Sequence, residues 1–140
     1  MNGNNPQPCP PPQGDLALDT NRAIAFLNGE ANATRQVSAA TRVFLPVPVV
    51  AELMYGALNS SNAAANVARV ERLRAACTVL EAHGSTADVY ARVRLALKQK
   101  GRPIPENDVW IASICIENTI PLATDDGHFS VVDDLVLATP

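Results

Sequence analysis

The sequence has no excess of positive charge and few aromatic residues. Its 140 residues include 11 lysines and arginines against 14 acidic residues, which gives a net charge of −3. Domains that coat nucleic acid through bulk electrostatics are usually strongly basic, so the sequence argues against that class, although a locally basic face is compatible with it. Aromatic residues make up only 4% of the chain, which gives little support to recognition of nucleic acid by base stacking.

Cysteine and histidine are also scarce. The three cysteines, Cys9, Cys77 and Cys115, are odd in number, widely spaced and without a CxxC pair. This pattern disfavours a disulfide framework or a zinc site and predicts free thiols in the reducing cytoplasm. The two histidines, His83 and His128, stand alone in the sequence, so no histidine-rich metal site is expected.

Long apolar runs are missing as well. The most apolar stretch, residues 43–58, is interrupted by two prolines and a glutamate and falls short of the roughly 20 residues of a membrane span. Residues 1–14 have neither the positive nor the apolar region of a signal peptide, and their five prolines predict a disordered tail. Residues 15–140 are expected to form one domain, because 47% apolar composition is enough for a core.

What the sequence does contain is an alternation of short apolar runs with longer helical patterns. The predicted strands are residues 16–18, 43–47, 78–80, 121–124 and 135–137. The predicted helices are residues 21–28, a segment that begins at Pro48, and residues 62–77, 85–100 and 105–117. Such an alternation implies crossover connections and a mainly parallel sheet, which places the chain in the α/β class.

Acidic residues fall where such a sheet binds ligands, beyond the carboxyl ends of its strands. Asp19 directly follows the first predicted strand, and Glu52 lies in the first turns of the helix after the second. Asp108 lies in the first turn of the last predicted helix, and Asp125 and Asp126 follow the fourth strand. These positions, far apart in sequence, map to the same edge of the sheet.

Glu52 is the least expected of these acids. Its run, PVVAELMYGAL, is otherwise apolar or small, and no basic residue occurs in residues 43–68. If the acids converge, each pair of like charges about 4 Å apart repels by roughly 4 kcal/mol at an effective dielectric constant of about 20. A divalent cation removes this repulsion, and oxygen ligands without nearby histidine or cysteine select Mg²⁺ or Mn²⁺ over zinc.

Most of these acids also have an ordinary structural explanation. Asp19 could cap a helix, Asp108 could interact favourably with a helix dipole, and Asp125 and Asp126 could be turn residues. For Glu52 the sequence offers no cap, turn or partner. The prediction of a metal site therefore depends on the coincidence of these positions and not on any single acid.

The segments that carry these acids resemble the PIN-domain ribonucleases, in particular the toxin of VapBC toxin–antitoxin pairs. The matching segments occur in the order of the family: LDTN at residues 18–21, AEL at 51–53, RPIPEND at 102–108 and TDD at 124–126. The resemblance covers residues 15–138 and implies a PIN-like three-layer α/β/α sandwich. The sequence departs from the family at Arg22, where an apolar residue is usual, and in the short segment of residues 28–42.

The resemblance also implies a catalytic site. It implies that Mg²⁺ or Mn²⁺ is bound by an acidic quartet: Asp19, Glu52, Asp108 and Asp126. Asp126 is preferred over Asp125 because the family's last acid comes two residues after a threonine or serine, here Thr124. Asp19 and Asp108 would be the direct metal ligands, with Thr124 and Asn21 in support, and the reaction would be hydrolysis of RNA to a 3′-hydroxyl and a 5′-phosphate.

The partners implied by the resemblance are RNA, a cognate VapB-type antitoxin and a second copy of the chain, with operator DNA bound only through the antitoxin and no membrane. One basic stretch leads toward Asp108 and is a candidate RNA contact, or else a solvated helix face: Arg92, Arg94, Lys98, Lys100 and Arg102.

Three other functions compete with this one. A phosphoaspartate receiver domain needs a lysine after a late strand, but the last lysine is Lys100. A haloacid-dehalogenase-type phosphatase needs an acid where Asn21 stands. The more serious alternative is a catalytically silent PIN-fold module that sequesters an antitoxin, against which the complete acidic quartet argues.

Overall fold

The computed structural model describes residues 14–139, so the tail predicted for residues 1–14 lies almost wholly outside it. In this range the chain forms four strands: β1 (Asp15–Leu18), β2 (Arg42–Pro46), β3 (Thr78–Leu80) and β4 (Leu122–Ala123). Its helices are α1 (Thr20–Leu27), α2 (Ala31–Ala39), α3 (Val47–Leu58), α4 (Ala63–Ala76), α5 (Gly84–Gln99) and α6 (Glu106–Asn118), followed by the 3₁₀ helix η1 (Gly127–Val131). The strand order is β3-β2-β1-β4 and every pairing is parallel, which confirms the predicted α/β class.

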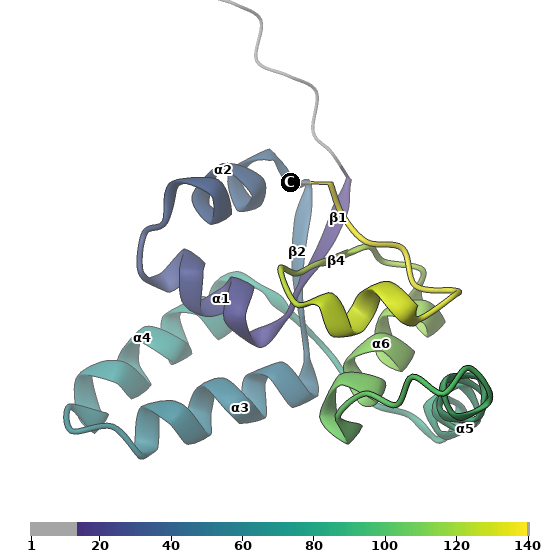
Figure 1. Ribbon diagram of the computed structural model, residues 1–140. Helices are drawn as coiled ribbons and strands as arrows, with labels where there is room; N and C mark the ends of the chain where they lie inside the picture. The colour runs from purple at the N-terminus through teal and green to yellow at the C-terminus, as the bar shows by residue number, and fades with distance from the viewer. Residues whose placement is uncertain (1–13, 140) are drawn as a thin grey trace, which may run out of the picture.

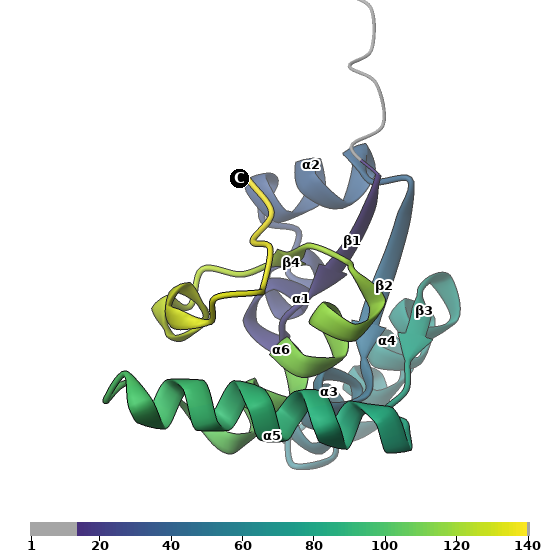
Figure 2. The same ribbon diagram turned by 90° about the vertical axis from the view of Figure 1, so that its right-hand side faces the viewer.

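The helices enclose the sheet from both sides. Figure 1 shows α1 and α2 on one side of the strands and α5 and α6 on the other, so that the sheet is the middle of three layers. Figure 2, turned by 90°, shows α5 as the long helix nearest the viewer. No helix within residues 14–139 is long and apolar enough to cross a membrane.

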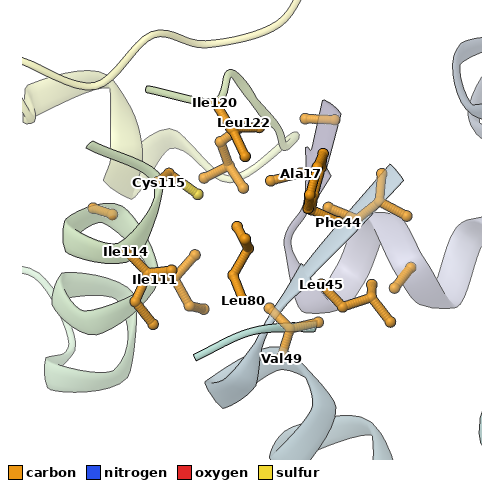
Figure 3. Packing of buried hydrophobic residues seen from close by; sticks show 14 of the residues in the cluster. Ala17, Phe44, Leu45, Val49, Leu80, Ile111, Ile114, Cys115, Ile120 and Leu122 are labelled. Carbon is orange, nitrogen blue, oxygen red and sulfur yellow. The ribbon is translucent and has the colours of Figure 1, made fainter. Parts of the chain in front are cut away.

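One part of the core lies between α6 and the sheet. Ile111, Ile114 and Cys115 of α6 face Leu80 and Leu122 of the strands, and all five side chains are buried (Figure 3). Removal of such apolar surface from water is the main force that fixes α6, and with it the acid in the first turn of α6, against the sheet. Burial raises the pKa of the Cys115 thiol to about 12, which leaves it protonated and unreactive.

Two predicted details were wrong. Residues 28–42 contain the helix α2, which sequence analysis missed because ANATRQVSA is mostly polar or small; its buried residues are Ala33 and Gln36. The predicted last strand at residues 135–137 forms only a single bridge between Leu137 and Leu122, so β4 stays at the edge of the sheet.

The register of the sheet determines which residues meet beyond the strand ends. Leu18 of β1 is paired with Ala123 of β4. The next residues along the two parallel strands are Asp19 and Thr124, and the Asp19 amide donates a hydrogen bond to the Ala123 carbonyl at 3.2 Å. The two side chains therefore leave the sheet side by side.

Candidate metal centre

Asp19 is fixed by hydrogen bonds at both of its carboxylate oxygens. It is the N-cap of α1, where its Oδ1 accepts a hydrogen bond from the Arg22 amide at 2.7 Å, and its Oδ2 accepts one from the Thr124 hydroxyl. Only 4% of the residue is exposed. Burial raises the pKa of the Asp19 carboxyl, the two hydrogen bonds oppose the rise, and the charges of Asp126 and Asp125 add to it.

Thr124 connects Asp19 to Asp126. The Thr124 hydroxyl donates to Asp19, and its oxygen accepts a hydrogen bond from the Asp126 amide at 2.9 Å. Asp126 in turn caps η1, since its Oδ1 accepts a hydrogen bond from the His128 amide at 2.9 Å. Thr124 thus connects the two acids, and the charge of Asp126 acts on Asp19, although Asp19 is not in the group of ligand atoms within 4.8 Å of one another that Asp126 belongs to.

Asp108 enters this group from α6, where it lies in the first turn. His128 Nδ1 lies 3.2 Å from Asp108 Oδ2 and 3.2 Å from Asp126 Oδ1, and each of the three residues offers a ligand atom within 4.8 Å of the other two. Burial raises the pKa of the Asp108 carboxyl, the hydrogen bond with His128 lowers it, and the charge of Asp126 and, to a smaller extent, that of Glu52 raise it. The pKa of Asp108 therefore responds to the charges of Asp126 and Glu52.

His128 is the residue of this group that sequence analysis missed, and the expectation of oxygen ligands without a nearby histidine was wrong. It is brought to the acids by η1, a single short turn that begins at the Asp126-Gly127 pair. An aspartate–glycine turn directly before a histidine was the available signal, because an aspartate that caps a turn holds the residue two positions later close to its own carboxylate.

Glu52 does not have the environment that its sequence suggested. The buried residues of α3 are Val49, Val50, Leu53 and Ala57, whereas Glu52 lies on the exposed side. It also has a partner, because the Thr20 hydroxyl donates a hydrogen bond to Glu52 Oε2. The expectation that this carboxylate has no partner is therefore wrong, although its charge still acts on Asp108.

Asn21 is exposed in the first turn of α1, and within the described part of the chain no hydrogen bond connects it to the acids. Its predicted supporting role thus rests on the resemblance alone.

The basic stretch does not form one surface. Arg94 donates a hydrogen bond to the Tyr90 hydroxyl at 3.0 Å, and Lys100 forms an ion pair with Asp133. Arg92 lies two residues before Arg94 and therefore on another side of α5. Lys98 and Arg102 are exposed and have no ion pair among residues 14–139.

The donor set fits a hard divalent cation. Its carboxylate oxygens are the ligands that Mg²⁺ and Mn²⁺ prefer, and the one imidazole nitrogen is tolerated better by Mn²⁺ than by Mg²⁺. Burial and mutual repulsion both disfavour the ionised forms of Asp19 and Asp108, and a bound cation would reverse both effects.

Comparison with known proteins agrees with this fold. The family model described as the PIN domain matches residues 16–135, and the chain belongs to that family. Within it the chain is a homologue of the VapC ribonuclease toxins. It is 31% identical over 121 residues to Ribonuclease VapC5 of Mycobacterium tuberculosis, which covers 83% of this chain and 86% of the relative.

Solved structures of VapBC proteins have the same fold. The structure of VapBC-1 from nontypeable Haemophilus influenzae matches with a TM-score of 0.81 and 29% identity, over 89% of this chain and 96% of that chain. VapBC2 from Rickettsia felis, bound to a DNA fragment from its promoter, matches with a TM-score of 0.80 and 24% identity, over 89% and 97%. The predicted PIN-like architecture is thereby confirmed.

Proposed function

We propose that this protein is a Mg²⁺- or Mn²⁺-dependent endoribonuclease toxin that a cognate antitoxin neutralises. The observation that carries the proposal is the convergence of acids from separate elements: Thr124 joins Asp19 to Asp126, and His128 lies between Asp126 and Asp108. The similarity to Ribonuclease VapC5 supports RNA as the substrate. RNA hydrolysis and free thiols both fit a cytoplasmic location.

Asp19, Asp108 and Asp126 would hold the cation, with His128 as a further donor beside Asp108 and Asp126 and Glu52 at the edge of the group. When bound, the ion would lower the pKa of a water molecule and stabilise negative charge on the phosphate. Asp126 or Glu52 would accept the proton of the attacking water. The bond between phosphorus and the 3′-oxygen breaks as the water oxygen bonds to phosphorus, which leaves a 3′-hydroxyl and a 5′-phosphate.

Removal of the metal tests this function directly. We expect cleavage of a mixed RNA preparation to stop in the presence of EDTA and to return when Mn²⁺ or Mg²⁺ is added in excess, whereas Ca²⁺, which is larger and bound with more flexible geometry, should restore little. Mapping of the RNA ends should show 3′-hydroxyl and 5′-phosphate groups. Cleavage that persists in EDTA would refute metal dependence.

Lys98 and Arg102 are the residues we propose to contact the RNA backbone, because both are exposed and neither is engaged within residues 14–139. Changing both to glutamate should raise KM for RNA with little effect on kcat, and should reduce the salt slope of binding by about 0.7 for each lost contact. Changing Arg72 and Arg74 of α4 to glutamate alters the net charge equally and should leave KM unchanged. Equal effects of the two pairs would show that only net charge matters.

The proposed antitoxin would bind close to the metal centre. A groove of about 290 Å³ between α1, α3 and α4 has Glu52 in its wall beside apolar residues that include Ile24 and Leu53. An apolar peptide segment in this groove would pass the active site, and operator DNA would be bound only through the antitoxin. A homodimer is proposed on the resemblance, and light scattering of the purified protein would measure it.

A further inference from the structure

Arg22 is a buried cation beside the metal centre, at the position where the sequence departs from the family. Only 8% of it is exposed. Its Nε donates a hydrogen bond to Gln36 Oε1 at 2.8 Å, and its Nη1 forms an ion pair with Asp125 Oδ2 at 3.0 Å. A buried charge is tolerated only when it is paired, so these two partners explain how α1 accommodates an arginine.

The partners of Arg22 come from separate parts of the fold. Gln36 is a buried residue of α2, and its Nε2 donates to the Thr139 carbonyl at 3.1 Å, which fixes the orientation of its amide. Asp125 lies in the loop after β4, and its side chain is 77% exposed. An exposed aspartate in a loop would otherwise be free to move in solvent. The ion pair with Arg22 therefore restricts the Asp125 side chain.

In the sequence, Asp125 lies between two residues that help to build the metal centre. Asp125 is preceded by Thr124, which holds Asp19, and followed by Asp126, which caps η1. The main chain of Arg22 contacts the same centre, since its amide donates to Asp19 Oδ1 at 2.7 Å. A single residue of α1 therefore contacts both strand ends, Asp19 through its backbone and the loop after β4 through its side chain.

We propose that Arg22 is a positioning residue whose guanidinium, held by Gln36, ties Asp125 to α1 and so fixes the loop that presents Asp126 to the metal ion. The effect on the metal rests on the proposed function, whereas the ordering of the loop does not. Arg22 touches neither substrate nor ion in this scheme. It acts through the backbone of residues 124–128.

The test compares two arginine–aspartate pairs in one protein. Arg22→Met, Asp125→Ala and the double variant remove the pair at the centre. Arg42→Met and Asp15→Ala remove a comparison pair at the opposite end of β1, where Arg42 Nη2 lies 2.9 Å from Asp15 Oδ2 and the arginine is exposed, not buried. Asp125→Ala changes an exposed side chain and keeps the test decisive if Arg22→Met fails to fold.

The first measurement is hydrogen exchange of the Asp126 and His128 amides in the metal-free protein, because these amides bond to Thr124 and Asp126. Arg22→Met and Asp125→Ala should both speed exchange there, whereas the Arg42 and Asp15 variants should not. In Mn²⁺ titrations the first two variants should raise Kd by about tenfold, the low end of losses seen when a supporting residue of a metal site is removed. The RNA cleavage rate kcat should fall while KM is retained.

The double variant should bind Mn²⁺ no more weakly than Arg22→Met, because the two residues act as one unit. The proposal would be overturned if Asp125→Ala showed the same amide exchange and the same Kd for Mn²⁺ as the wild-type protein. It would also be overturned if the loss of Mn²⁺ affinity in the double variant equalled the sum of the two single losses. Failure of the proposed function looks different: the wild-type protein itself would bind no Mn²⁺ or cleave no RNA, and the exchange comparison would then decide the ordering of the loop alone.

Discussion

Replacement of Asp108 by asparagine is expected to abolish metal-dependent RNA cleavage while making the metal-free protein more stable. Asparagine has nearly the same shape as aspartate but no charge. It therefore removes the cost of burying a carboxylate and the repulsion from Asp126 and Glu52, the two effects that raise the pKa of Asp108. It also removes a metal ligand that acts in the transition state, and losses of about 100-fold or more in kcat are usual for such groups. Asp19→Asn should also abolish cleavage, but it replaces one of the two acceptor oxygens of Asp19 with an amide donor, so no gain in stability is expected for it.

The measurements are single-turnover cleavage of RNA and thermal unfolding without metal. Asp134→Asn, an equal change at an exposed acid outside the site, should leave both unchanged. The same variants separate the enzyme from a silent binding module. An enzyme loses cleavage and growth arrest but keeps its antitoxin, whereas a module has no cleavage to lose. Loss of stability together with loss of cleavage in both variants would show that these acids are structural.

Addition of Mn²⁺ or Mg²⁺ is expected to raise the melting temperature at neutral pH and to have little effect in acid. Because the pKa values of Asp19 and Asp108 are raised in the fold, their contribution to stability is complete below the pKa of the unfolded chain and is lost as pH rises through the folded values. A metal ion binds the ionised carboxylates and restores what was lost. The gain should therefore grow as pH rises through those values.

At a metal concentration of about 100 times Kd the stabilisation should be about 2.7 kcal/mol, which corresponds to roughly 10 °C for a domain of this size. Scanning calorimetry at several pH values, with NaCl at matched ionic strength as the control, measures this. The Asp108→Asn variant should show a much smaller shift. An equal shift at every pH, or an equal shift with NaCl, would mean that general screening and not a site is responsible.

The order of elements could be predicted from sequence because each strand is a short apolar run and each main helix has a capping signal or a proline near its start. The helix α2 was missed because its residues are mostly polar or small and no proline or capping side chain marks its start, so that the buried Ala33 and Gln36 did not stand out. The prediction of a strand at residues 135–137 was wrong because a short apolar run does not show whether another strand lies beside it to pair with its backbone.

For the site, the sequence predicted which acids lie near the strand ends, but not the exposure of Glu52 or the burial of Arg22. The positions of Asp19, Asp108 and Asp126 follow from the rule that ligands gather beyond the carboxyl ends of parallel strands. The apolar run around Glu52 did not reveal that α3 buries one side only and leaves Glu52 exposed, with the Thr20 hydroxyl as its partner. The burial of Arg22 depends on Gln36 and Asp125, 14 and 103 residues away, which no spacing rule connects.

Both carboxylate oxygens of Asp19 are already engaged before any ion arrives, one by a main-chain amide and one by a hydroxyl. The rotamer of this side chain is therefore set during folding, and its rotational freedom is lost at that stage and not on binding. Coordination at Asp19 should for this reason carry only a small entropic penalty from the side chain. Each oxygen accepts only one hydrogen bond, so each would keep a lone pair that a cation could use.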